Sequence, residues 1–349
     1  MQERKYNELG SEFWLPDIPK EIETYALSGR TAIDLIIQDM QMAGRTCKSV
    51  YMPAWCCDSM LQSFIDRGVA IQFYDVSIAE SSLSCHVDEN IDVDILYVTN
   101  YFGYNSTLST DVIEQFKRKG CSVIYDRTHS LFRNEEDYIA IADYTFASIR
   151  KWLGVPCGAM LSKKEGQLAL PKMKDCSYIN NKVEAMTLKA AYMEQPKEDL
   201  KPIFLDLYGR FGHQLAEDYR DYKMDELSQN IWQYADKQAL MKNRCTNAVL
   251  LQACLKEIPH IHQIFTFVKG DCPLFVPVLL DSKEERDALR KHLTAHAIYC
   301  PVHWPKPALL PDGMKANELY DCELSLLCDQ RYGLDDMQLI VNTIKEFYQ

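Results

Sequence analysis

Short apolar runs alternate with amphipathic helical patterns along the first half of the chain. The runs are rich in Val, Ile, Tyr and Phe and are bounded by turn residues, as expected of buried strands. They lie at 49–52, 69–74, 94–100, 121–125 and 144–148. Helical patterns at 60–65 and 109–119 separate them and end at Gly68 and Gly120. Strands that alternate with such helices predict a three-layer α/β domain, a mainly parallel sheet with helices on both faces.

The first helical pattern precedes these strands. Its apolar face follows the i, i+3, i+4, i+7 spacing of a helix and consists of Ile33, Ile36, Ile37 and Met40. Gly44 ends the pattern. Thr31 followed by Asp34 resembles a capping box, so we expect this helix to begin between Gly29 and Thr31.

The pattern changes at about residue 205, where longer helical stretches begin. Helices are expected at 228–257 and 283–294, with a strand-like run, PLFVPVLL, at 273–280 between them. A final amphipathic helix, DDMQLIVNTIKEFY, follows near the end of the chain. This mixture predicts a second, smaller unit of the α+β class.

Length and pattern together divide the chain into three parts. At 349 residues it is long enough for about two domains of ~150 residues each. Residues 1–25 contain Trp14, Pro16 and Pro19 without clear periodicity, which indicates an N-terminal arm that lies across another surface. We expect residues 26–227 to form the large α/β domain and residues 228–349 the small C-terminal α+β domain.

Composition and charge narrow the class of protein. A hydrophobic fraction of 47% and a charged fraction of 25% are typical of a folded chain. The net charge of −12 repels nucleic acid and anionic membranes, so neither is an expected partner. The start, MQERKYNELG, lacks the apolar run of a signal peptide, and no run of eighteen apolar residues follows. We therefore expect a cytoplasmic protein that acts on small molecules.

The thirteen cysteines do not form a metal motif. They are odd in number, scattered, and include no C-x-x-C pair, and the adjacent Cys56 and Cys57 lack the spacing of zinc ligands. In a reducing compartment, most such cysteines are small buried hydrophobic residues. No metal site is predicted from the sequence.

Reactive side chains gather where the expected strands end. In an open parallel sheet, ligands bind at the carboxyl ends of the strands. The residues there are Asp126 to His129, Ser148 to Lys151 and Pro53 to Trp55, and Ser28 to Thr31 opens the first helix. Together they offer an amine, a carboxylate, an imidazole, hydroxyls and a helix N-terminus. Pyridoxal phosphate uses this set: a lysine for its Schiff base, an aspartate for its ring nitrogen and a cradle for its phosphate.

These segments, in this order, resemble the type I pyridoxal-phosphate aminotransferase fold and, within it, the DegT/DnrJ/EryC1/StrS sugar aminotransferases. The resemblance covers most of the chain. SIRKWLGVPCGA is similar to the family's segment around the Schiff-base lysine and VIYDRTH to the strand before its pyridine-nitrogen aspartate, which implies these catalytic roles for Lys151 and Asp126. The cofactor-binding residues implied besides these two are Gly29, Arg30, Thr31, Trp55, His129 and Ser148.

The resemblance extends into the C-terminal part. IYCPVHWPKP at 298–307 is similar to the turn of the small domain that borders the substrate, and LSLLCDQRYGLDDM at 324–337 to the stretch before the last helix. It implies His303, Trp304 and Arg331 as substrate contacts. It also implies a homodimer, because this fold builds each site with residues from both subunits.

The chain departs from the family pattern at several positions. The ring-stacking aromatic of the family is replaced by Cys57, and an asparagine that reaches the neighbouring subunit's phosphate is replaced by Asp221. Gly158-Ala159 occupies the position where the family has two consecutive glycines. Two roles for Arg150 stay open: its cation favours the neutral amine of Lys151, or it forms a salt bridge elsewhere.

The resemblance therefore implies a transaminase that moves an amino group from glutamate to a nucleotide-linked keto sugar. Two alternatives stay open. A sugar dehydratase or other pyridoxal-phosphate chemistry uses the same fold, although such dehydratases can replace the lysine that this chain keeps as Lys151. A non-catalytic relative that binds sugar or protein is suggested by Cys57 and Asp221.

Overall fold

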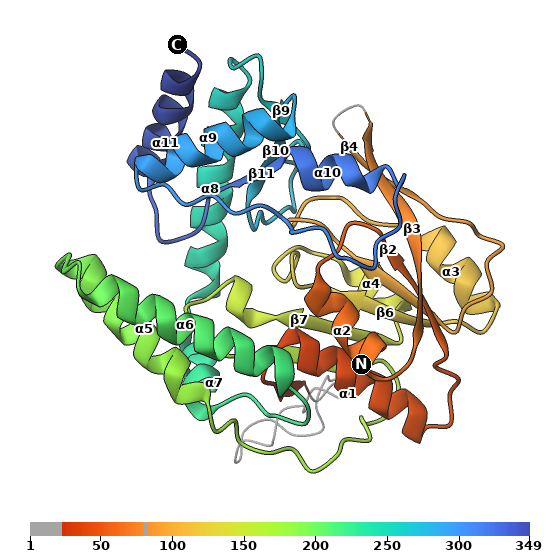
Figure 1. Ribbon diagram of the computed structural model, residues 1–349. Coiled ribbons are helices and arrows are strands. Elements are labelled where there is room, and N and C mark those ends of the chain that lie inside the picture. Colours follow the sequence, from red (N-terminus) through yellow and green to blue (C-terminus); the bar gives the residue numbers. More distant parts are fainter. Residues whose placement is uncertain (1–22, 80–81) are drawn as a thin grey trace, which may run out of the picture.

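The computed structural model describes residues 23–79 and 82–349 (Figure 1). Its largest sheet has the strand order β1-β8-β7-β6-β5-β2-β3-β4. The strands are β1 (Thr24–Ala26), β2 (Ser49–Pro53), β3 (Ala70–Ala79), β4 (Ser82–His86), β5 (Ile95–Thr99), β6 (Ser122–Asp126), β7 (Tyr144–Ser148) and β8 (Ala159–Lys163). From β7 to β3 neighbouring strands run parallel, whereas β8, β1 and β4 pair antiparallel. The predicted mainly parallel sheet is confirmed.

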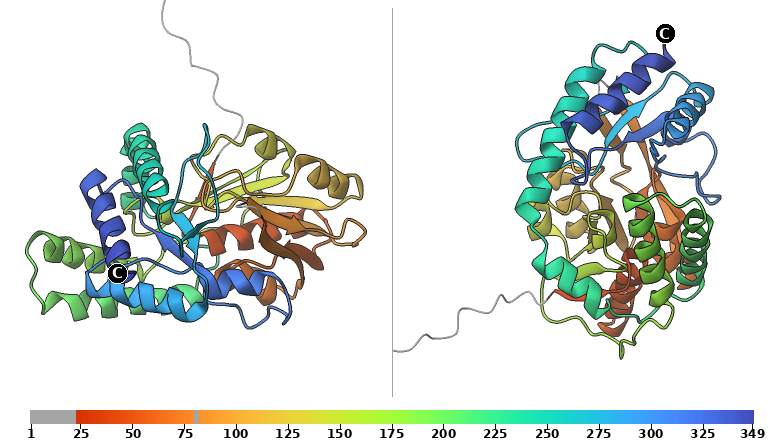
Figure 2. Two further views of the ribbon diagram at one scale, coloured as in Figure 1. Left: turned by 90° about the horizontal axis from the view of Figure 1, so that it is seen from above. Right: turned by 90° about the vertical axis from the view of Figure 1, so that its left-hand side faces the viewer.

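Helices cover both faces of this sheet (Figure 2). Alternate residues of β5 enter two different cores, Ile95 and Tyr97 on one face and Leu96 and Val98 on the other. The first core is shared with α1 (Gly29–Met42) and α2 (Asp58–Asp66). The second is shared with α3 (Thr110–Arg118) and α4 (Glu136–Ile141). The three-layer α/β architecture is therefore confirmed.

The helix α1 begins where predicted, but a different residue caps it. The side chain of Ser28 accepts the backbone N–H of Thr31 at 3.2 Å, so Ser28 is the N-cap. The expected capping box of Thr31 and Asp34 is wrong. Asp34 is fully buried and pairs with Arg67, whose Nε lies 2.6 Å from its carboxylate.

The expected N-terminal arm lies mostly outside the described residues. Its residues 1–22, with Trp14, Pro16 and Pro19, are not described. The next residues belong to the sheet, because Thr24–Ala26 form β1 and pair antiparallel with β8.

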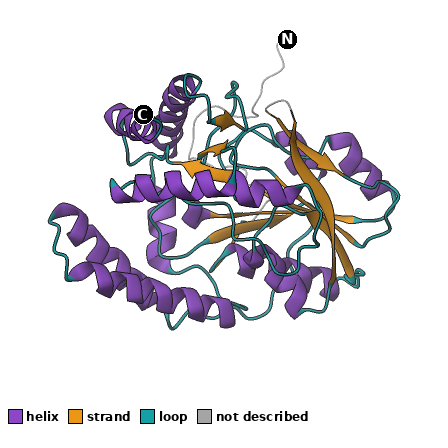
Figure 3. Cartoon of the chain, turned by 45° about the horizontal axis from the view of Figure 1, so that its top comes forward, coloured by secondary structure: helices purple, strands orange, loops and turns teal. Residues whose placement is uncertain are grey.

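Two helices that follow β8 had no counterpart in the sequence prediction. They are α5 (Ile179–Glu194) and α6 (Leu200–Glu217), and they pack against each other as a hairpin that extends from the body of the molecule (Figure 3). Phe211 and Leu215 near the end of α6 join a core with residues that flank the sheet. This anchor brings the base of the hairpin to the carboxyl ends of the strands.

The expected helix at 228–257 is two helices, α7 (Glu226–Tyr234) and α8 (Lys237–Leu255). Ala235 between them has extended backbone, with φ −62° and ψ 134°, and ends α7. The side chain of Asp236 then accepts the N–H of Ala239 at 2.9 Å and starts α8 as its N-cap.

The C-terminal part is built on a second sheet. Its strands β9 (His262–Gln263), β10 (Val276–Leu279) and β11 (Glu323–Leu326) are antiparallel in the order β11-β10-β9. Its own core joins these strands to α8, α9 (Lys283–Ala295) and α11 (Leu334–Phe347), while α10 (Ala316–Cys322) packs against β3 of the large sheet. This is the smaller α+β domain expected from the sequence. Among the described residues, no helix is long and apolar enough to cross a membrane.

Candidate functional site

A pocket lies at the carboxyl ends of β6 and β7, where the sequence placed the reactive residues. Asp126 ends β6, Ser148 ends β7, and Lys151 closes the short 3₁₀ helix that follows β7. The pocket is lined by Ser28, Gly29, Arg30, Ile33, Cys57, Ser59, Met60, Thr99, Asp126, Thr128, His129, Phe146, Ser148, Arg150, Lys151, Leu215 and Trp304. The fold thus brings together residues from the large sheet, α1, α6 and the small domain.

The carboxylate of Asp126 is held from two sides. One oxygen accepts the hydroxyl of Tyr97 at 2.7 Å, and the other accepts the backbone N–H of Thr128 at 2.8 Å. Burial raises the pKa of Asp126, while Thr128, Tyr97 and the cation of Lys151 oppose that rise. The two hydrogen bonds fix the carboxylate at the base of the pocket, and both stabilise its ionised form.

Lys151 reaches the same pocket from the end of β7. Its side chain is open to solvent through the pocket, yet protein surrounds it on the other sides. This burial lowers the pKa of Lys151, and the cation of Arg150 adds to the effect, against the opposing influence of Cys57 and Asp126. A lower pKa increases the fraction of neutral amine, the form that acts as a nucleophile.

The start of α1 and the end of β7 form a polar wall of the pocket. Ser28 and Gly29 open α1, and the helix itself provides no acceptor for its first N–H groups. A Cβ on Gly29 would lie 3.5 Å from the Cβ of Ser148, so the two segments are in contact. A helix N-terminus beside a hydroxyl is a common arrangement for binding an anion.

Two arginines on this wall have unused hydrogen-bonding capacity. Arg30 donates from Nη1 to the carbonyl of Leu215 at 2.9 Å, and Arg150 lies over the ring of Phe211 at 5.9 Å. The Nε atoms of both arginines are buried and have no partner among the described residues. Neither arginine forms a salt bridge with a described carboxylate, so the salt bridge considered for Arg150 is not found. Burial lowers the pKa of both groups.

Aromatic rings from both domains close the other side of the site. The ring of His129 lies 5.3 Å from that of Trp304, with 31° between their planes, and 5.5 Å from that of His303. Burial, with the nearby cation of Lys151, lowers the pKa of His303 to about 3. Burial also lowers the pKa of His129 well below its ordinary value. Both imidazoles are therefore neutral at pH 7.

Four of the residues proposed from the sequence do not line the pocket. Thr31 is buried, and its hydroxyl donates to the carbonyl of Tyr219 at 2.8 Å. The indole of Trp55 is fully buried, donates from Nε1 to the carbonyl of His303 at 2.7 Å and so supports that turn from behind. His303 itself is buried behind Trp304 and His129. Arg331 is 63% exposed and forms a bidentate pair with Asp329.

The departures from the family pattern have clear structural settings. Cys57, where the resemblance implied a ring-stacking aromatic residue, lines the pocket. Asp221 lies outside it, in the left-handed region at φ 61°, and accepts the side-chain amide of Gln38 at 2.8 Å. Gly158 has φ 133°, and a Cβ there would lie 2.6 Å from Cε of Met224. Both the backbone angle and this contact disfavour a side chain at position 158.

Sequence reasoning missed several residues of the pocket. Thr99 is the last residue of β5, and Thr128 lies two residues after β6 in the stretch from Asp126 to His129, but neither was given a role of its own; an inspection of every polar residue at a strand end finds both. Leu215 comes from α6, and its apolar pattern is indistinguishable from that of an ordinary core helix. Only the tertiary structure assigns Leu215 to the site.

No protein-family model matches the chain, and no curated protein sequence matches it. Solved structures do match. A DegT DnrJ EryC1 StrS aminotransferase from Brucella abortus superimposes with a TM-score of 0.64 at 14% identity, over 93% of this chain and 85% of the other. PseC from Helicobacter pylori, an aminotransferase involved in the biosynthesis of pseudoaminic acid, superimposes with a TM-score of 0.66 at 14% identity, over 93% of this chain and 86% of the other. NtdA from Bacillus subtilis, with the cofactor PMP bound, superimposes with a TM-score of 0.63 at 15% identity, over 94% of this chain and 73% of the other. The chain therefore has the fold of the solved DegT/DnrJ/EryC1/StrS aminotransferases, as the sequence motifs implied.

Proposed function

We propose that this protein is a pyridoxal-phosphate-dependent aminotransferase that moves an amino group from glutamate to a nucleotide-linked keto sugar. One observation carries the proposal: a lysine amine with a lowered pKa and a buried carboxylate line the same pocket. Asp126 ends β6, and Lys151 closes the 3₁₀ helix after the neighbouring strand β7, in a fold that the solved aminotransferases share. The sugar acceptor is a hypothesis that rests on the motif resemblance and on the name of another matching structure, the putative sugar aminotransferase Spr1654 from Streptococcus pneumoniae.

The residues of the pocket fit pyridoxal phosphate. When bound, this cofactor supplies an electron sink for the carbon that loses or gains the amino group. Asp126 would accept a hydrogen bond from the ring nitrogen and keep it protonated. Nζ of Lys151 would anchor the cofactor and, once released as a neutral amine, would carry a proton to and from the substrate carbon. The match to NtdA, which was solved with PMP, supports the choice of cofactor.

We assign the phosphate of the cofactor to the wall formed by Ser28, Gly29, Ser148, Arg30 and Arg150. The unpartnered Nε atoms of the two arginines favour an anion at this wall, because a buried donor without a partner is costly. In this proposal Arg150 binds the phosphate of the cofactor. Arg30 and Arg150 would supply positive charge to the phosphate from the same chain as Lys151. Asp221, which replaces the asparagine implied by the resemblance, is negatively charged and cannot.

The first experiment tests the lysine. The purified chain is incubated with pyridoxal phosphate, reduced with borohydride and digested, and the peptides are analysed by mass spectrometry. We expect the pyridoxyl group on Lys151, and we expect a new absorption band that Lys151→Ala abolishes and Arg150→Ala retains. Equal spectra for wild type and Lys151→Ala contradict the proposal and favour a non-catalytic relative.

The second experiment tests the phosphate assignment by comparing the affinities of pyridoxal phosphate and pyridoxal. A charge-assisted hydrogen bond contributes about 1.5–3 kcal/mol, so Arg150→Met should weaken binding of the phosphorylated form by roughly 10- to 100-fold. The same change should leave the affinity for pyridoxal within about threefold. Arg210→Met is the matched control, because Arg210 is exposed and pairs with Asp206 outside the pocket. An equal loss for both ligands shows that Arg150 does not bind the phosphate.

The third experiment tests the reaction. Incubation of the loaded protein with glutamate should convert the cofactor to its pyridoxamine form and release 2-oxoglutarate, both detected by chromatography. A panel of nucleotide-linked keto sugars should then return the cofactor to its first form. Consumption of a sugar without any requirement for glutamate indicates the dehydratase instead.

We further propose that the protein is a homodimer in the cytoplasm. The helical hairpin exposes large apolar side chains, with Met193, Ile203 and Leu205 each about half or more exposed, which favours a partner surface there. All thirteen cysteines are free and none is fully exposed, which is consistent with a reducing compartment. Light scattering after gel filtration should give twice the chain mass, and Ile203→Glu with Leu205→Glu should reduce it.

A further inference from the structure

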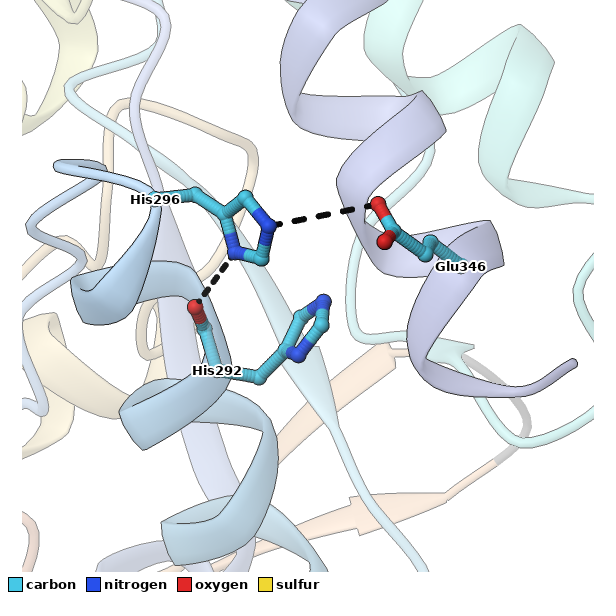
Figure 4. Close-up of side chains that lie close together, drawn as sticks. All are labelled: His292, His296 and Glu346. Carbon is cyan, nitrogen blue, oxygen red and sulfur yellow. Dashed lines mark hydrogen bonds and ion pairs between the residues drawn. The ribbon is translucent and has the colours of Figure 1, made fainter.

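Two histidines at the end of α9 face a glutamate on α11, in the small domain (Figure 4). His292 lies in the last turn of α9 and His296 is its C-cap, one turn apart on one face of the helix. Glu346 lies in the last turn of α11. The ligand-type atoms of all three lie within 4.8 Å of one another, and none of the three lines the pocket around Lys151.

The hydrogen bonding of His296 leaves its outer nitrogen free to bind a metal. Nδ1 of His296 lies 2.9 Å from the backbone carbonyl of His292. A carbonyl oxygen only accepts, so Nδ1 carries the hydrogen, and in the neutral ring Nε2 holds a lone pair. Nε2 faces Glu346 at 4.0 Å. A backbone acceptor that orients the ring in this way is usual for histidines that bind metals.

His292 has an unused nitrogen in the same place. Its Nε2 is buried and has no hydrogen-bond partner among the described residues. The ring packs against Phe347 of α11, with the ring centres 5.5 Å apart, and against His296 at 4.5 Å. A buried polar atom without a partner is costly unless something else binds it.

A second group of similar composition lacks these features. Asp281 already accepts from His260 at 2.9 Å and from His262 at 2.6 Å. Glu285 beside it accepts the hydroxyl of Tyr348 at 2.8 Å. Because its carboxylates have protein donors, this second group is complete without an ion and serves as an internal comparison.

We propose that His292, His296 and Glu346 bind a zinc ion that links α9 to α11. Two imidazoles and a carboxylate are ligands that zinc takes in tetrahedral sites, and water would be the fourth. Bond lengths of about 2.0–2.2 Å require ligand atoms about 3.4 Å apart, so the site closes by small rotations of half-buried or exposed side chains. The bound ion joins the ends of two helices that cover the same core, and its expected effect is on the stability of the small domain.

The test uses the full chain without a polyhistidine tag, freed of metal with a chelator. Zinc chloride is titrated by calorimetry into wild type, His292→Ala, His296→Ala and Glu346→Gln. We expect one zinc per chain at this site and at least tenfold weaker binding in each variant. Zinc should also raise the melting temperature of wild type but not of the double variant His292→Ala/His296→Ala. His260→Ala is the matched control and should bind zinc as wild type does.

Cobalt separates this site from adventitious binding to cysteine. Cobalt bound to nitrogen and oxygen shows visible absorption without the intense ultraviolet bands of thiolate ligation, and we expect the first kind of spectrum. Equal zinc affinity in wild type and the double variant overturns the proposal, as does a thiolate spectrum or a loss of binding in His260→Ala. Glu346→Gln alters only an exposed side chain, so it keeps the test valid if a histidine variant misfolds.

Discussion

The buried carboxyl group of Glu323 makes stability depend on pH in a way that a single substitution should remove. Glu323 begins β11, and its residue is completely buried. One oxygen accepts the backbone N–H of His303 at 2.7 Å, and the other bonds with the hydroxyl of Ser325. Burial raises the pKa of Glu323 to about 8, although His303, Ser325 and the cation of Arg286 oppose the rise.

Glu323 loses its proton at different pH values in the folded and unfolded chains. An unfolded glutamate loses its proton near its ordinary pKa of 4.5, whereas the folded group keeps it until about pH 8. Between these values the unfolded state binds fewer protons, so the free energy of unfolding falls as pH rises. At pH 7, about 2.5 pH units above the ordinary pKa, the loss from this one group is about 3 kcal/mol, at 1.36 kcal/mol per unit.

Glu323→Gln should cancel this loss. Glutamine presents the same groups as the protonated acid, an acceptor toward His303 and a donor toward Ser325, but it does not ionise. Urea unfolding at pH 5 should give wild type and variant within about 1 kcal/mol, because the acid is neutral in the folded chain there. At pH 7 the variant should be more stable by about 3 kcal/mol. Glu114→Gln is the control, since that exposed glutamate should change neither value.

If the stability of Glu323→Gln falls with pH as steeply as that of wild type, Glu323 is not the group responsible. If the variant is the less stable protein at pH 7, the carboxylate is the stabilising form and the expected sign is wrong. Either outcome means that Arg286 and the two hydrogen bonds outweigh burial.

Three further predictions concern the pocket and its supports. Gly158→Ala should lower the free energy of unfolding by about 2–4 kcal/mol, because φ is 133° and Cε of Met224 would lie 2.6 Å from the added Cβ. Urea unfolding measures this loss, and an unchanged midpoint contradicts the prediction. Trp55→Phe removes the donor to the carbonyl of His303 and should lower the free energy of unfolding by about 1–3 kcal/mol, while the absorption band of bound cofactor remains. Loss of that band in a folded variant would instead make Trp55 a cofactor contact. Asp126→Asn should still take up the cofactor on Lys151 but react with glutamate about 10²-fold more slowly, measured by single-turnover absorbance, and an unchanged rate removes the assigned role.

The sequence alone indicated the five parallel strands of the large sheet and placed Asp126 and Lys151 at their carboxyl ends, whereas the antiparallel strands β1, β4 and β8 were not predicted. The apolar runs that became β2, β3, β5, β6 and β7 are local signals, because a strand covered on both faces needs apolar side chains at nearly every position. Asp126 and Lys151 follow from the rule that parallel strands present their carboxyl ends at one edge. Their placement in a single pocket agrees with that expectation.

Other features depended on contacts between distant parts of the chain. The cap of α1 is Ser28 and not Thr31, and the carboxylate of Asp34 pairs instead with Arg67, the residue that caps the C-terminus of α2. Trp55 is an aromatic residue of the kind that stacks on a cofactor ring. Its indole N–H instead donates to the backbone carbonyl of His303, and Trp55 does not line the pocket. Neither partner is near in sequence, so no local pattern distinguishes these outcomes.

The sequence by itself thus determined the class of fold and the order of the parallel strands β2, β3, β5, β6 and β7 along the chain, and it singled out Lys151 and Asp126 as candidates for the reactive amine and carboxylate. Tertiary structure decided which neighbours those groups have. Arg30 meets α6 through the carbonyl of Leu215, and Arg150 lies over Phe211, so both arginines border the pocket with buried donors unused. The physical reason is that hydrophobic periodicity lies within short stretches of sequence. Burial, pKa and hydrogen-bond satisfaction depend on residues that come into contact only when the chain has folded.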